Sequence, residues 1–181
     1  GLTSDNKSNA DNDNTPQKQV VENIAVIGTD KLAVSYEIVA TKDMSHKAIG
    51  SGSLSDYSVS ELQKLPTDKK INYKVVVDNK IKADQVNLTV AAIIQDITKK
   101  DKEVDEIIID LYSDKAIIDT AYDVANAVWA PKGELGNVTA DIAGSNDRSS
   151  YKTTITVKPN LDEYLTQKNK NEDIFGLSET Q

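Results

Sequence analysis

The only histidine of the chain, His46, lies among serine hydroxyls and aspartate carboxyls that could act together with it. These neighbours are Ser45, Ser51, Ser53, Asp43 and Asp56. A serine nucleophile, a histidine base and an orienting aspartate form a hydrolytic triad, but its members usually come from separate elements of the fold. No G-x-S-x-G turn between a strand and a helix surrounds His46. The sequence therefore favours an exposed loop histidine over a catalytic one.

Two other segments contain residues that could bind ions. The run GSGS at residues 50–53 lacks the lysine and the spacing of a phosphate-binding P-loop. The stretch DKEVDE at residues 101–106 groups four acids that could bind a cation weakly. They are Asp101, Glu103, Asp105 and Glu106. A charged, solvated sheet edge is the more common role of such a group, and we predict that role here, with no metal and no cofactor.

Trp129 ends the alternating segment AYDVANAVWAP, just before a turn that contains Pro131 and Gly133. A tryptophan at such a place could anchor a partner, because the indole ring offers a large contact area and a hydrogen-bond donor. The alanines that alternate with Trp129 favour a position in the core instead. The candidate binding surface that we name from the sequence consists of Trp129, His46 and Tyr57.

The composition excludes several classes of function. The chain has no cysteine, which excludes disulfides, thiol nucleophiles and thiolate metal sites. Its net charge is −8 and no dense basic patch occurs, so we expect no nucleic-acid partner. No run of about 18 apolar residues is present, so we expect no segment of this sequence to span a membrane.

The periodicity of apolar residues predicts the elements that must position these side chains. Helical spacing predicts a helix over residues 83–99, and alternation predicts strands at 70–78 and 103–113 on either side of it. A strand–helix–strand unit of this kind implies a right-handed crossover and a parallel pair. The remaining expected elements are strands at 24–27, 31–41, 121–131 and 150–158, a short helix capped by Ser58 and a final helix capped by Asn160.

This order of elements predicts an α+β fold with a mixed β-sheet, one βαβ unit plus antiparallel strands, and helices packed on one face. Residues 1–20 are predicted to be a disordered tether, because their polar side chains bury too little apolar surface to offset the entropy of ordering. Residues 21–170 are expected to form a single α+β domain, and residues 171–181 a C-terminal tail.

The polar start of the chain, LTSDNKSNADNDNTPQKQV at residues 2–20, resembles the tether of Gram-positive bacterial surface lipoproteins, which follows their lipidated cysteine. The segments DEIIIDLYSD and YDVANAVWAPKGE resemble small α+β extracellular domains of unknown function in such proteins. The resemblance implies an extracellular location and anchoring to the bacterial cell membrane through an N-terminal lipid that is absent from this chain. It implies no catalytic residue.

We therefore expect a non-enzymatic, envelope-tethered extracellular domain that binds a protein, a peptide or a cell-wall component. Two alternatives remain open. One is a small hydrolase with a site at the His46 loop, and the other is a structural component of a secretion or envelope assembly that uses a sheet edge as its interface.

Overall fold

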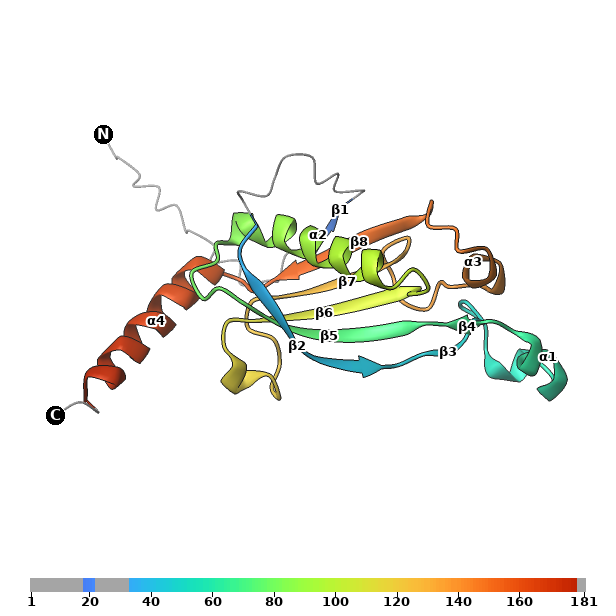
Figure 1. Ribbon diagram of the computed structural model, residues 1–181, viewed down its shortest axis with the longest axis horizontal. Helices are drawn as coiled ribbons and strands as arrows, with labels where there is room; N and C mark the ends of the chain where they lie inside the picture. The colour runs from blue at the N-terminus through green and yellow to red at the C-terminus, as the bar shows by residue number, and fades with distance from the viewer. Residues whose placement is uncertain (1–17, 22–32, 179–181) are drawn as a thin grey trace, which may run out of the picture.

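The computed structural model describes residues 18–21 and 33–178, and a mixed six-stranded sheet forms its centre (Figure 1). The strand order is β1-β8-β7-β6-β5-β2. Strands β5 and β6 run parallel, and the other neighbouring strands run antiparallel. The predicted α+β fold is thus confirmed. The six strands are β1 (Lys18–Val21), β2 (Tyr36–Asp43), β5 (Lys70–Val77), β6 (Glu106–Tyr112), β7 (Ala125–Pro131) and β8 (Tyr151–Val157).

Helix α2 (Ala83–Lys100) connects β5 to β6 and crosses one face of the sheet, as the sequence predicts (Figure 1). The apolar face that the spacing predicts is buried against the sheet, where it meets Val75, Ile107 and Ile109. Its members are Val86, Val90, Ile93, Ile94 and Ile97. Full burial of a side chain of this size contributes about 1.5–3 kcal/mol, so this layer is the main apolar core.

The opposite face of the sheet carries a row of polar side chains. Asp110 on β6 accepts a hydrogen bond from Asn72 on β5 at 3.0 Å and one from Asn126 on β7 at 2.8 Å. The row follows from the two-residue period of a strand, since Ile109 and Leu111 on either side of Asp110 point into the core. The two faces of the sheet therefore differ in chemistry, with the main apolar layer on the side of α2.

Short elements form a lobe at the end of the sheet where β5 and β6 begin (Figure 1). The predicted helix there is confirmed with its capping box, in which Ser58 N donates to Glu61 Oε2 at 2.7 Å and Glu61 N donates to Ser58 Oγ at 3.3 Å. Helix α3, beside β4, was not predicted, because its six residues show no apolar period. The elements are β3 (His46–Lys47), η1 (Leu54–Asp56), α1 (Val59–Lys64), β4 (Thr67–Asp68) and α3 (Ala140–Ser145).

Helix α4 (Leu161–Ser178) follows β8 and extends beyond the other end of the sheet, past the turn that contains η2 (Lys115–Ile117) (Figure 1). Leu161 and Leu165 in its first turns complete the core. The helix continues through residues 171–178, which the sequence analysis assigned to a tail. Within residues 33–178, no helix combines the length and the apolar content that crossing a membrane requires.

The start of the sheet and the register of β2 also differ from what the sequence predicts. Residues 18–20, assigned to the tether, lie in β1, which pairs antiparallel with β8 and adds a strand to that edge of the sheet. In β2 the register shifts between Ile38 and Ala40, so Ala40 does not share a face with Tyr36 and Ile38, as strict alternation along the strand would require. The reason is a β-bulge, which reverses the facing of the residues that follow it. The strand expected at residues 24–27 lies outside the described residues.

A buried aspartate fastens α4 to the sheet. Asp123 accepts hydrogen bonds from Ser113 N at 2.8 Å, from Ser113 Oγ at 2.6 Å and from the Tyr164 hydroxyl at 2.9 Å. Lys168 Nζ lies 3.4 Å from the same carboxylate. Burial alone would raise the pKa of Asp123, but the hydrogen bonds from Ser113 and Tyr164 and the charge of Lys168 outweigh it and lower the pKa.

Replacing Asp123 by alanine is expected to lower the free energy of unfolding by about 3 kcal/mol at pH 7, because it leaves the Lys168 charge and the Ser113 N–H without their partner. Urea denaturation measures the loss. Because the folded-state pKa is lowered, the contribution of Asp123 is complete at neutral pH and disappears as the pH falls through that pKa. The control Glu172→Gln, at an exposed position of the same helix, should stay within about 0.5 kcal/mol of the wild type. A loss below about 1 kcal/mol for D123A contradicts this role.

Candidate functional site

Ionisable side chains converge at the end of the sheet where the parallel strands β5 and β6 begin. The first residues of these strands, Lys70 and Glu106, are register partners. Lys70 Nζ lies 2.7 Å from Glu106 Oε2, with side chains exposed by only 11% and 0%. The other Glu106 oxygen, Oε1, accepts a hydrogen bond at 2.7 Å from the N–H of Gly136. Gly136 has a φ of 83°, a conformation that favours glycine, so the turn after β7 is shaped to present this N–H.

Asp68, on β4, adds a second carboxyl group to this buried pair. The residue is fully buried, and no N–H donor among the described residues hydrogen-bonds to either of its carboxyl oxygens; the hydrogen-bonding group beside it is the carboxyl of Glu106. The pKa of Asp68 is raised to about 7, with burial as the largest cause and the Glu106 carboxylate as the next, while the charge of Lys70 partly opposes the rise. Two carboxyl groups thus share the single positive charge of Lys70, and the more poorly neutralised of them is Asp68.

His46, on β3, closes the cluster on its solvent side. Its Nδ1 lies 2.8 Å from the carbonyl oxygen of Lys47, which can only accept, so Nδ1 carries the hydrogen. The lone pair of the neutral ring is then on Nε2, which lies 3.0 Å from Lys70 Nζ and 3.4 Å from Asp68 Oδ2. The side chain is 42% exposed. His46 therefore lies in a strand and faces two buried charges, unlike the loop histidine that the sequence favoured.

The cluster has the parts of a metal site and lacks those of a triad. The side-chain nitrogen or oxygen atoms that His46, Asp68 and Glu106 can offer a metal ion lie within 4.8 Å of one another. No serine or threonine hydroxyl of the described residues contacts the His46 ring, and Ser45 Oγ accepts a hydrogen bond from Lys70 N at 3.2 Å instead. A histidine and an aspartate without a hydroxyl provide no nucleophile for acyl transfer.

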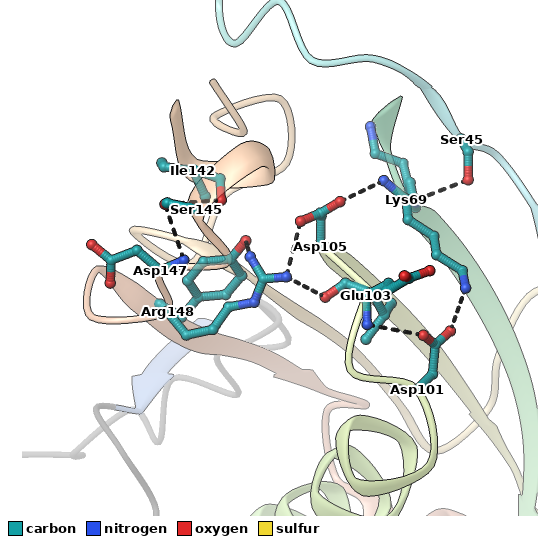
Figure 2. Close-up of polar contacts among 12 residues, drawn as sticks. Ser45, Lys69, Asp101, Glu103, Asp105, Ile142, Ser145, Asp147 and Arg148 are labelled. Atoms are coloured by element: carbon teal, nitrogen blue, oxygen red, sulfur yellow. Dashed lines mark hydrogen bonds and ion pairs between the residues drawn. The ribbon is translucent and has the colours of Figure 1, made fainter. Parts of the chain in front are cut away.

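Asp105 joins the cluster to a second group of side chains through β6. Its two carboxylate oxygens accept from Arg148 Nη2 at 2.9 Å and from Lys69 N at 2.8 Å, as Figure 2 shows. The guanidinium also donates to the Tyr151 hydroxyl at 2.8 Å, and lies 4.8 Å from the centre of that ring. Trp129 packs on Tyr151 with ring centres 4.4 Å apart. These contacts hold Asp105 and Arg148 in fixed positions.

A groove of about 570 Å³ opens beside Asp105. Lys69 reaches along it to Asp101 at 2.8 Å, and Glu103 lies next to this pair (Figure 2). Glu103 makes no ion pair within the described part of the chain. The lining includes Asp43, Ser45, Lys69, Glu103, Asp105 and Asn146. Because carboxylates outnumber ammonium groups in this lining, the groove presents a negative potential.

Another hollow, of about 430 Å³, lies between β1, the start of α2 and the start of α4. None of the residues that line it is a buried ionisable side chain, and none belongs to the charged cluster. The groove beside Asp105 is therefore the better candidate for specific polar recognition.

The three residues of the predicted binding surface have different surroundings. Trp129 is half-buried and packs against the core, which agrees with the interpretation that the sequence favoured. Its ring lies 5.8 Å from the Arg148 guanidinium, whereas His46 contacts Lys70 and Asp68. Tyr57 follows η1 in the lobe, and no hydrogen bond or ring contact of the described residues joins it to the other two.

The prediction of a solvated acidic edge is wrong for Asp105 and Glu106, which are 3% and 0% exposed. The reason is that β6 is a central strand with neighbours on both sides. Sequence analysis also missed Asp68, Lys70 and Arg148 as members of the site. One signal was available: a lysine and a group of acids lie at the starts of the two strands that were predicted to be parallel neighbours.

Comparison with known proteins gave no match among protein-family models, curated proteins or solved structures.

The unusual pKa of Asp68 predicts how stability depends on pH. Because Asp68 has a folded-state pKa of about 7 against an ordinary value of 3.8, the folded protein binds more protons than the unfolded chain between these values. The contribution of Asp68 to the free energy of unfolding is therefore greatest below about pH 4, and it is lost as the pH rises through about 7. Asp68→Asn should remove this fall and stabilise the protein at pH 8 by on the order of 3 kcal/mol.

Urea denaturation between pH 4 and 8, with a chelator present, measures this difference. The matched control is Asp119→Asn, since the Asp119 side chain is 97% exposed. It should leave the pH profile unchanged. A D68N protein that is less stable than the wild type at pH 8 would show that the Asp68 carboxylate is well neutralised in the folded protein.

Proposed function

We propose that this chain is a non-enzymatic, envelope-tethered extracellular domain that binds a positively charged peptide segment of a protein partner. The groove beside Asp105 is the single observation on which this proposal depends most. Of the partners expected from the sequence, which were a protein, a peptide or a cell-wall component, a basic peptide fits the charges of the groove best.

The floor of the groove favours binding because it is held in place before any ligand arrives. Arg148 and the Lys69 backbone fix both oxygens of Asp105, and Arg148 Nη2 also donates to the carbonyl of Val104 at 2.9 Å. Side chains held in this way lose little conformational entropy when a ligand binds. A preformed surface of this kind suits recognition.

The charges on the rim favour a cationic ligand. Asp43 and Glu103 are exposed on the lining, and Asp101 already neutralises Lys69. A lysine or arginine side chain entering the groove would meet two carboxylates that form no ion pair with the described residues. Acidic surface patches also raise the association rate of basic partners.

Binding is favoured over catalysis because His46 lacks a hydroxyl nucleophile among its contacts. The hydrolase alternative stays a prediction, as does a role in an envelope assembly.

Tethering is supported by the lipoprotein-like composition of residues 2–20. The residues encoded before Gly1 test it: a signal segment that ends in a lipidation cysteine supports the tether, and a gene that lacks one contradicts it.

The binding proposal predicts that a hexalysine peptide shifts backbone amide resonances of the groove in a ¹⁵N-labelled protein, and that a hexaglutamate peptide does not. The shifts should fall at residues 43–45, 67–69, 103–105 and 143–146. The double variant Asp43→Asn/Glu103→Gln should bind hexalysine about fivefold more weakly, as expected when two exposed ion pairs of about 0.5 kcal/mol each are lost.

The control for this experiment is Glu172→Gln/Asp173→Asn, two exposed carboxylates on α4 that change the net charge by the same amount. It should bind hexalysine as the wild type does. Equal weakening in the control, or shifts scattered over the whole surface, would show that the peptide responds to overall acidity and that the groove is not its site.

A further inference from the structure

We propose that His46, Asp68 and Glu106 form a binding site for a divalent metal ion of the Zn²⁺ class, in which the ammonium of Lys70 is the competing cation. This inference is independent of peptide binding in the groove, since none of its three ligand residues lines the groove. It also differs from the expectation of the sequence analysis, which predicted no metal.

Asp68 carries the inference because its carboxyl group is fully buried and no N–H donor of the described residues hydrogen-bonds to it, so when it is ionised it faces the second carboxyl, that of Glu106. A buried carboxylate without donors or a counter-ion is costly, and such groups in proteins are paired or coordinate metals. The nearest positive charge, Lys70 Nζ, is shared with Glu106 Oε2 at 2.7 Å and with His46 Nε2 at 3.0 Å. One monovalent ammonium thus faces two carboxyl groups, which a divalent ion would neutralise completely.

The distances suit tetrahedral coordination. Zn²⁺ binds histidine nitrogen and carboxylate oxygen at about 2.0–2.2 Å, so neighbouring ligand atoms of a tetrahedral site lie about 3.3 Å apart. His46 Nε2 and Asp68 Oδ2 are 3.4 Å apart. The third ligand atom, from Glu106, lies within 4.8 Å of both, a separation that small side-chain rotations reduce. Three protein ligands leave a fourth position for water or for a ligand atom.

Outer contacts orient two of the three ligands as metal sites require. The Lys47 carbonyl holds the Nδ1–H of His46, which directs the Nε2 lone pair toward the cluster. The Gly136 N–H holds Glu106 Oε1 and leaves Oε2 to face Lys70. The Nδ1–H···O=C contact is a common second contact of metal-bound histidines.

The exposed side of His46 gives an ion a route to the cluster. The His46 side chain is 42% exposed, so the cluster is open to solvent on this side. Lys70 carries its charge on a flexible four-carbon stem, which lets the ammonium withdraw when a metal replaces it. The imidazole, with two carboxylates, suits Zn²⁺ and its cobalt substitute better than Mg²⁺, which prefers oxygen ligands alone.

Titration with Co²⁺ and Zn²⁺ tests the site directly in the whole chain. Co²⁺ in tetrahedral coordination absorbs visible light strongly, so wild-type protein should gain a visible band that one equivalent of Zn²⁺ removes. His46→Ala, at a half-exposed position, and Asp68→Asn, which preserves shape, should each weaken Zn²⁺ binding more than tenfold in calorimetry. The control Asp119→Asn, at a side chain that is 97% exposed and outside the cluster, should bind Zn²⁺ as the wild type does.

The variant Lys70→Met distinguishes a metal site from a cluster of ion pairs that is purely structural. Removal of the competing ammonium should tighten Zn²⁺ binding at least tenfold, and Zn²⁺ should raise the melting temperature of this variant more than that of the wild type. The proposal is overturned if the wild type binds neither ion, or if H46A and D68N bind Zn²⁺ as tightly as the wild type. It is also overturned if K70M binds Zn²⁺ no more tightly than the wild type does.

Discussion

The register of the two parallel strands places opposite charges side by side at the buried start of the sheet. Lys70 and Glu106 are the first residues of β5 and β6, and this pairing fixes them as neighbours. A buried charge is tolerated only with a partner, so the chain around this pair has to supply further polar groups. Three groups from different segments surround the Lys70–Glu106 pair: the Gly136 N–H, the Asp68 carboxyl and the His46 ring. The lobe that holds β3 and β4 is thereby drawn onto the end of the sheet.

The same end of the sheet combines two kinds of polar surface. The inner one is the buried cluster of His46, Asp68 and Glu106 around Lys70, in which one ammonium group faces two carboxyl groups. The outer one is the groove beside Asp105, which Arg148 stiffens and where carboxylates outnumber cations. Both surfaces have an excess of carboxyl groups, and we propose a metal ion as the ligand of the first and a basic side chain as the ligand of the second. The opposite end of the sheet differs, because Asp123 there is fully hydrogen-bonded and serves to hold α4.

Periodicity was sufficient for the framework of the fold. The helix at residues 83–99, its buried face and the parallel pair around it follow from apolar spacing, because burial of a continuous apolar face dominates the stability of such units. Elements whose structure depends on distant partners were missed. The two-residue strand β3 exists because β4 pairs with it, and α3 has no apolar period of its own. Likewise, Asp105 and Glu106 were predicted to be surface acids, because the groups that bury and pair them, Arg148, Lys70 and the Gly136 N–H, come from distant parts of the sequence.

The central claim is that the Asp68 carboxyl is buried with too little positive charge around it. Carboxyl ¹³C NMR of metal-free protein follows the ionisation of this one group as the pH changes. A midpoint near 7 is the result that the structure predicts, because burial and the Glu106 carboxylate both oppose ionisation. A midpoint near 4, the ordinary range for aspartate, would mean that the carboxylate is already well neutralised, and it would contradict the account of the whole cluster.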